Sequence, residues 1–247
     1  MKRLLFLIII SIGLLALPEL RKSVFQSGER RTDYAVEGID VSRYQAEVDW
    51  LAIRDAGFDF AFMKATEGQE LRDVYFEQNW SLAGQSGLKR GAYHFFRPEV
   101  SPTVQARHFF GQVDLQAGDL PPVLDVEVVG ELSQEELVQA VSTWLEMAEA
   151  HYGIAPILYT GQKFYNRYLA GRFDQYPLWL ARYAPHEPVA ACGRAFQFWQ
   201  YAQVGRVKGI AGHVDLNVFA GELSDLERLC MPVEAPTELD GFFAKEK

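Results

Sequence analysis

The sequence predicts an α/β fold built as an irregular TIM-like barrel. Eight short β-like runs are present, and amphipathic stretches separate the first five of them, which is the pattern of strands and helices around a parallel sheet. Eight strands within about 180 residues favour a closed barrel over an open sheet. Few helices fit between the last three runs, so we expect a (β/α)5(β)3 arrangement.

The predicted strands cover residues 37–42, 58–66, 88–96, 121–127, 154–160, 177–183, 195–201 and 213–219. Helical periodicity predicts helices near 47–56, 73–86, 101–117 and 133–152, and a shorter one near 162–170. The fourth helix has the clearest start, because Ser133 and Glu136 have the spacing of a capping box ahead of an apolar helical face.

The N-terminus has the composition of an export segment. Lys2 and Arg3 precede an apolar run at residues 4–17, so residues 1–20 are either a cleaved signal peptide or an uncleaved membrane anchor. A polar linker at 21–36, a catalytic-type domain at 37–230 and a tail at 231–247 complete the predicted organisation. We therefore expect a monomer that is exported to the periplasm or the cell exterior and is either free or anchored through residues 4–17.

Composition narrows the classes of partner. The formal charge is -9, with 24 Lys plus Arg against 33 Asp plus Glu, which argues against nucleic acid as a ligand. Cys192 and Cys230 are the only cysteines; in an exported protein they form either one disulfide or two separate buried thiols.

Polar residues gather at the C-terminal ends of the predicted strands, where βα barrels carry their active sites. Each alone also fits a turn cap, a surface ion pair or a core position. The members of this set are Asp40, Lys64, Glu67, Tyr93, His94, Asp125, Glu127, Tyr159, Arg182, Tyr183, Gln200, Tyr201, Asp215 and Asn217.

The segment PPVLDVEVVG at 121–130 carries the strongest chemical signal. Asp125 and Glu127 stand two residues apart in an apolar strand, so both side chains should lie on one face. Burying a carboxylate without a partner costs several kcal/mol, so two on one face indicate a functional cleft. Such a pair suits glycoside hydrolysis, with the longer Glu127 as general acid and Asp125 as its partner.

Other chemistries find less support in the sequence. The five histidines lack H-x-x-x-H and H-E-x-x-H spacing, and neither a Gly-rich phosphate loop nor a G-x-S-x-G elbow is present. We therefore expect no metal and no other cofactor. Aromatic platforms for sugar rings are available at Tyr93, Tyr159, Trp179, Trp199 and Tyr201, although core packing is expected for at least two of these five.

Over residues 37–221 the chain resembles glycoside hydrolase family 25, the Chalaropsis and phage type of lysozyme. GIDVSRYQ, FMKATEG, GAYHFF, VLDVE, LYTG, LWLARY, FWQY and VDLNVF carry the resemblance in this order. It implies an N-acetylmuramidase that cleaves the β-1,4 bond between N-acetylmuramic acid and N-acetylglucosamine in peptidoglycan glycan strands. It also implies catalytic roles for Glu127, Asp125, Asp40 and Asp215.

The stereochemical course stays open at this stage, because an i,i+2 pair reaches either the retaining or the inverting separation by choice of rotamer. We favour a retaining route in which the substrate's own 2-acetamido group is the nucleophile and Asp125 orients it. Two other hypotheses are a glycan-binding or immunity module without turnover, and a hydrolase of chitin-like glycans.

Overall fold

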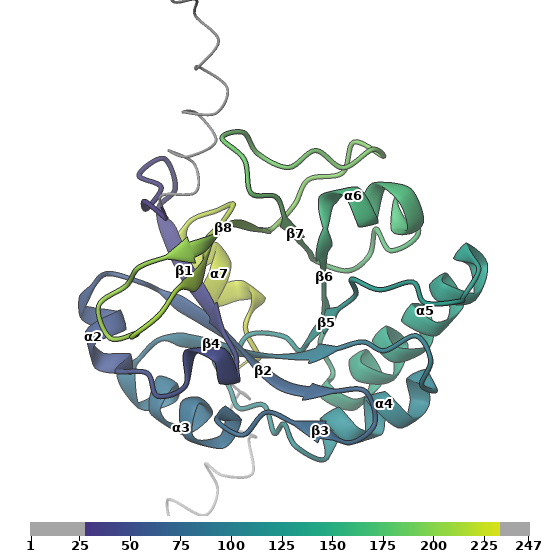
Figure 1. Ribbon diagram of the computed structural model, residues 1–247, viewed down its shortest axis with the longest axis horizontal. Helices are drawn as coiled ribbons and strands as arrows, with labels where there is room; N and C mark the ends of the chain where they lie inside the picture. Colours follow the sequence, from purple (N-terminus) through teal and green to yellow (C-terminus); the bar gives the residue numbers. More distant parts are fainter. Residues whose placement is uncertain (1–27, 233–247) are drawn as a thin grey trace, which may run out of the picture.

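The computed structural model describes residues 28–232 and forms a closed barrel (Figure 1). The sheet has nine strands, of which all but the two-residue β3 (Leu71–Arg72) make up the barrel. Closure follows from β1 (Val36–Val41), which pairs with β2 (Phe60–Glu67) on one side and with β9 (Val214–Phe219) on the other. The predicted irregular TIM-like barrel is thereby confirmed.

The remaining barrel strands follow chain order around the sheet. They are β4 (Lys89–Phe95), β5 (Val123–Asp125), β6 (Ile157–Gly161), β7 (Leu178–Ala181) and β8 (Phe198–Gly205). Neighbours from β1 to β8 are parallel, apart from β3, and only β9 runs antiparallel to both of its partners in the barrel. All eight predicted strands are present.

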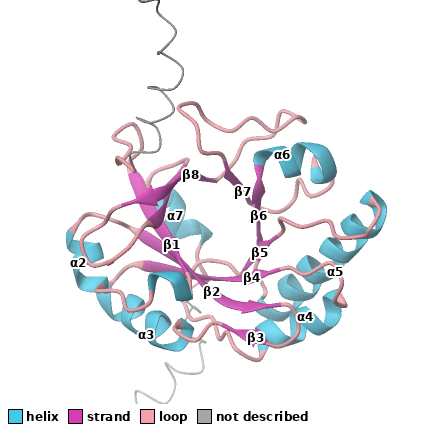
Figure 2. Ribbon diagram, in the orientation of Figure 1, coloured by secondary structure: helices cyan, strands magenta, loops and turns pink. Residues whose placement is uncertain are grey.

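Helices surround the first part of the barrel, as Figure 2 shows. They are α2 (Trp50–Asp55), α3 (Phe76–Ser86), α4 (Pro102–Phe110), α5 (Gln134–Tyr152) and the three-residue α6 (Gln162–Phe164), which continues into a π-helical turn, η2 (Tyr165–Leu169). A 3-10 turn, η1 (Arg43–Gln45), follows β1. The short predicted helix at 162–170 is thus α6 and η2 together.

The capping box of α5 is confirmed. The Ser133 hydroxyl accepts from the Glu136 backbone N–H at 3.3 Å, and the Glu136 carboxylate accepts from the Ser133 N–H at 2.8 Å. By contrast, α4 ends at Phe110 rather than near 117, because the chain turns at Gly111 and the Asp119 carboxylate accepts from the Gln116 N–H.

One helix was not predicted, and it covers the end of the barrel opposite the acids. Helix α7 (Leu223–Leu229) contributes Leu226 to the inner core cluster, and Cys230 follows it there. Glu227 reaches Lys89, the first residue of β4, at 4.0 Å. This end of the barrel is therefore sealed by protein.

The interior changes from apolar to polar along the barrel axis. The layers at the α7 end are filled by apolar side chains, namely Phe60, Phe62, Val123, Ile157, Phe198 and Phe219. Room for the rings comes from glycine: a Cβ on Gly38 would lie 2.4 Å from the Phe60 ring, and one on Gly91 2.5 Å from that of Phe62. Since inward residues alternate along a strand, the next inward positions place polar side chains at the open end.

Several predictions concern residues at the two ends of the chain. The export segment 1–20, the anchor residues 4–17, part of the linker and residues 233–247 of the tail lie outside the described residues. The described part of the linker contacts the barrel: Arg30 pairs with Glu37, and Arg31 lies 4.4 Å over the Trp199 ring. Within residues 28–232, no helix is long and apolar enough to cross a membrane.

The two cysteines are separate thiols in this structure. Cys230 is buried and Cys192 is exposed, so neither the disulfide nor the pair of buried thiols describes them.

Candidate active site

A pocket of about 270 Å³ opens at the C-terminal ends of the strands. Every barrel strand contributes at least one wall residue, and the antiparallel β9 contributes Asp215 near its N-terminal end. Its walls contain ten of the residues that the sequence singled out: Asp40, Lys64, Tyr93, Asp125, Glu127, Tyr159, Trp179, Tyr183, Gln200 and Asp215.

Asp40 and Asp215 face each other across the β1–β9 pair and are held by two amides. Gln200 donates from Nε2 to Asp40 at 2.7 Å and to Asp215 at 3.3 Å, and Asn217 donates to Asp40 at 2.8 Å. Asn217 is itself fixed, because its Oδ1 accepts from the Trp179 indole at 2.9 Å. This pair of acids is therefore held in place by neutral amide donors.

Gln200 is oriented by two phenols. The hydroxyls of Tyr159 and Tyr183 donate to its Oε1 at 2.9 and 2.7 Å. Because the amide oxygen is engaged by two O–H donors, the amide nitrogen must face the acids. The network thus presents N–H groups to Asp40 and Asp215.

The same surroundings shift the pKa values of both acids upward. Burial raises the pKa of Asp40 to about 6, although the bonds from Asn217 and Gln200 act in the opposite direction. Burial and the adjacent Asp40 charge raise the pKa of Asp215 to about 9. One proton is therefore held between these two carboxyls at neutral pH, as expected for like charges in one site.

Asp125 and Glu127 make up the second acid pair, and both line the same pocket as predicted. Strand β5 ends at Asp125, which is 6% exposed, and Glu127 lies beyond the strand on the exposed rim. Burial and the charge of Glu127 raise the pKa of Asp125 well above its usual range. Its Oδ1 has no hydrogen-bond partner among the described residues.

Glu127 combines access to solvent with a raised pKa. The pocket walls still remove enough water to raise the pKa of its carboxyl, while the neighbouring Tyr159 phenol and the charge of Lys64 lower it. A rim carboxyl in this state can hold a proton and reach a substrate.

Lys64 and Glu67 form an ion pair at the edge of the pocket. Lys64 Nζ lies 2.6 Å from Glu67 Oε2, and Arg97 donates to the other carboxylate oxygen. Burial would raise the pKa of Glu67, but the bonds from Lys64 and Arg97 outweigh it and lower the pKa. Glu67 thus acts through Lys64, and only Lys64 reaches the pocket.

Three of the predicted substrate-binding residues point away from the pocket, and strand alternation explains each. Tyr93 points into the barrel, so His94 points outward: it is fully buried, bonds Thr66 and Gln105, and stacks on Trp144. Gln200 likewise points inward, so Trp199 and Tyr201 belong to the outer core. Burial lowers the pKa of His94 to about 3, which leaves it neutral.

Three residues of the pocket were not singled out by the sequence. They are Ser42, Tyr44 and Phe95. The same alternation was the available signal for Phe95, which stands two residues after Tyr93. Tyr44 lies in η1 and is 79% exposed, so no strand pattern identifies it.

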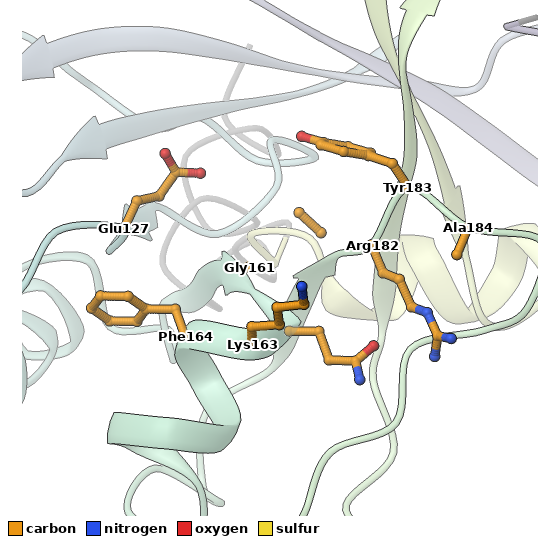
Figure 3. A pocket seen from close by; sticks show the side chains of 9 residues that line it. Glu127, Gly161, Lys163, Phe164, Arg182, Tyr183 and Ala184 are labelled. Atoms are coloured by element: carbon orange, nitrogen blue, oxygen red, sulfur yellow. The ribbon is translucent and has the colours of Figure 1, made fainter. Parts of the chain in front are cut away.

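A second pocket, of about 660 Å³, shares Glu127 and Tyr183 with the first. Figure 3 shows Glu127 and Phe164 at one end, Arg182 and Ala184 at the other, and Lys163 between them. Arg182 was predicted as a site residue and lines this pocket rather than the acid pocket. Lys163 and Phe164 come from α6, whose role the sequence did not indicate.

Comparisons with known proteins point to one family. The model of the family "Glycosyl hydrolases family 25" matches residues 39–210. YegX of Escherichia coli K12 is 50% identical over 199 residues, which cover 78% of this chain and 73% of that protein. Lysozyme M1 of Streptomyces globisporus is 35% identical over 205 residues, covering 77% of this chain and 70% of that protein.

Solved structures show the same barrel. A family 25 glycosyl hydrolase from Bacillus anthracis superposes with a TM-score of 0.78 at 33% identity, covering 83% of this chain and 97% of that chain. A lysozyme from Streptomyces coelicolor gives a TM-score of 0.75 at 33% identity, with coverages of 79% and 97%. This chain is a glycoside hydrolase and belongs to glycosyl hydrolase family 25.

Proposed function

We propose that the protein is an N-acetylmuramidase that cleaves the β-1,4 bond between N-acetylmuramic acid and N-acetylglucosamine in peptidoglycan. The observation that carries the proposal is the shared pocket of Asp125 and Glu127 at the open end of a family 25 barrel. Relatives named as a lysozyme and as an N,O-diacetylmuramidase support the choice of substrate.

Glu127 is the general acid in this proposal. Its raised pKa favours the protonated carboxyl, and its exposed position lets that proton reach the glycosidic oxygen of a bound chain. As the C–O bond breaks, the proton moves to the leaving oxygen and Glu127 becomes a carboxylate. That carboxylate then takes a proton from the incoming water.

Asp125 steers the substrate in the same proposal. Its Oδ1 lacks a partner among the described residues and needs a donor when ionised, and the N–H of a 2-acetamido group can supply one. The acetamido carbonyl oxygen then attacks the anomeric carbon, and the ring that forms carries positive charge beside Asp125. Water opens this ring from the opposite face, which gives net retention.

The remaining pocket residues bind the sugar and shape the field around it. Tyr93, Tyr159 and Trp179 form aromatic walls, while Lys64, Gln200 and the shared proton of Asp40 and Asp215 limit the negative charge near the reacting carbon. We further propose that the enzyme works outside the cytoplasm, where peptidoglycan lies. Anchoring through residues 4–17 and the monomeric state remain predictions.

Mass spectrometry of a peptidoglycan digest tests the activity. The wild-type chain should release fragments whose new reducing ends are N-acetylmuramic acid, and Glu127→Gln should release none above background. Reducing ends of N-acetylglucosamine, or cleavage of chitin oligomers alone, would contradict the proposal. If the wild-type chain bound glycan chains without cleaving them, it would instead be a binding module.

A further inference from the structure

The second pocket carries positive charge beside the catalytic acid. Lys163 and Arg182 both line it, and Glu127 is its only acidic wall residue. Neither cation forms a salt bridge with any residue in the range 28–232; Arg182 only donates to the Glu187 backbone carbonyl, at 2.8 Å. The pocket therefore offers two cations that the described protein does not neutralise.

The positive charge of this second pocket contrasts with the negative net charge of the whole chain. The formal charge is -9, so anions gain nothing from the protein's overall field. Around the neighbouring acid pocket, by contrast, Lys64 and Arg97 both form ion pairs with Glu67. Two unneutralised cations that share a pocket with Glu127 thus fit local recognition of an anionic group.

The other walls indicate what carries that anionic group. Phe164 supplies an apolar face, and Gln162 supplies an amide whose Oε1 is buried without a hydrogen-bond partner among the described residues. An unsatisfied amide oxygen calls for an N–H donor. A ligand with backbone N–H groups, carbon-rich side chains and carboxylates is an acidic peptide.

We propose that Lys163 and Arg182 form a subsite for the carboxylates of the acidic peptide borne by the glycan substrate. This inference rests on the proposed function. In peptidoglycan the peptide hangs from the lactyl ether of the muramic acid ring whose C1 reacts, so it leaves the glycan beside the bond that Glu127 protonates. The second pocket begins at Glu127 and has a volume of about 660 Å³, within the range of ligand-binding clefts.

Kinetics on two soluble glycans test the subsite in the full-length chain. One glycan keeps its peptides, and the other has lost them to an amidase and retains only the lactyl carboxylate. For Lys163→Gln/Arg182→Gln we expect KM on the peptide-bearing glycan to rise roughly 5- to 30-fold, with kcat within about twofold, since partly exposed charge pairs contribute modestly. On the stripped glycan the change in KM should stay below about twofold.

A matched control removes the same charge elsewhere. Arg206 and Lys208 are exposed, line neither pocket and lie in the β8–β9 loop. Arg206→Gln/Lys208→Gln should leave KM unchanged on both glycans. The subsite is wrong if the Lys163/Arg182 variant keeps the wild-type KM on peptide-bearing glycan. It is also wrong if this variant raises KM equally on the stripped glycan, or if the control variant raises KM by the same factor.

Direct binding separates this inference from the proposed function. Calorimetry with a peptide-bearing muropeptide should show at least about fivefold weaker binding when Lys163→Gln/Arg182→Gln is added to a Glu127→Gln background. If wild type cleaves no glycan but this loss of affinity appears, the subsite stands and the proposed activity fails. If wild type cleaves peptidoglycan and affinity is unchanged, the activity stands and the subsite fails.

Discussion

The two acid pairs of the pocket differ in how far the protein itself satisfies them. Asp40 and Asp215 receive hydrogen bonds from Gln200 and Asn217, in a network that extends to the Trp179 indole. Asp125 Oδ1 has no partner among the described residues. The difference suggests that the first pair is a fixed support, while the second is kept open for the substrate.

The positions of the two acid pairs on the strands agree with this difference. The supported pair lies on the paired strands β1 and β9, whereas the open pair lies at and just beyond the end of β5. A partner for Asp125 within the protein would compete with the substrate.

The largest effect is expected at the open pair. Glu127→Gln keeps the size of the side chain but removes the transferable proton, so activity on peptidoglycan should fall by roughly 10²- to 10⁴-fold. Initial release of reducing ends measures this. The matched control is Glu146→Gln, an exposed position on α5, which should keep wild-type activity; equal losses in both variants would contradict the assignment.

Gln200→Leu removes the amide that donates hydrogen bonds to Asp40 and Asp215. Its amide holds the pKa of Asp40 down, so its loss should raise that pKa and move the acid limb of the kcat/KM profile to higher pH. We expect kcat/KM near neutral pH to fall roughly 10-fold, in line with hydrogen bonds to charged groups. Gln203→Leu, at an exposed position on the same strand, should have no such shift. An unchanged profile for Gln200→Leu would refute this role.

Asp215→Asn should stabilise the fold at alkaline pH. The pKa of Asp215 is about 9 in the folded chain and roughly 4 when unfolded, so between these values the folded state binds more protons. Folding stability from this group is therefore present below pH ~4 and is lost as the pH rises toward 9. Asparagine cannot ionise, so the variant should not lose this stability as the pH rises.

Thermal unfolding at pH 4, 6 and 8 checks the sign. The Tm of Asp215→Asn should exceed that of wild type at pH 8, by roughly 2–4 °C for each kcal/mol gained, and the difference should shrink toward pH 4. A difference that grows as the pH falls would mean that Asp215 is held ionised rather than protonated.

The smallest effects distinguish the two faces of the barrel wall. Tyr159→Phe removes an inner hydroxyl that bonds Gln200, and kcat should fall roughly 3- to 10-fold. Tyr201→Phe removes an outer hydroxyl that has no partner among the described residues, and kcat should change by less than about twofold. Steady-state kinetics on the same glycan compare the two, and equal losses would contradict the inward and outward assignment.

The barrel was predictable because its strands alternate with helices and its polar residues follow strand ends. The sequence did not show that His94, Trp199 and Tyr201 point outward, because runs such as AFQFWQY are apolar on both faces and give no sign of which residues face the barrel interior. Once Gln200 is taken as inward, alternation alone moves Trp199 and Tyr201 to the outside.

Other features depend on tertiary arrangement. Lys163 and Phe164 reach Glu127 only because the turn after β6 folds beside the end of β5, and no local pattern encodes that approach. Helix α7 has a short apolar pattern in its seven residues, and its place under the barrel follows from Leu226 and Cys230 packing inside. The open state of Asp125 likewise appears only once its neighbours are in position.

We propose that Asp125 is kept unpartnered to hold the acetamido group of the substrate. Proton NMR of the first products from a soluble peptidoglycan glycan tests this role most directly, because the anomer that forms before mutarotation reports the stereochemical course. The β-anomer should appear first in wild type. Initial formation of the α-anomer would show inversion and contradict the claim.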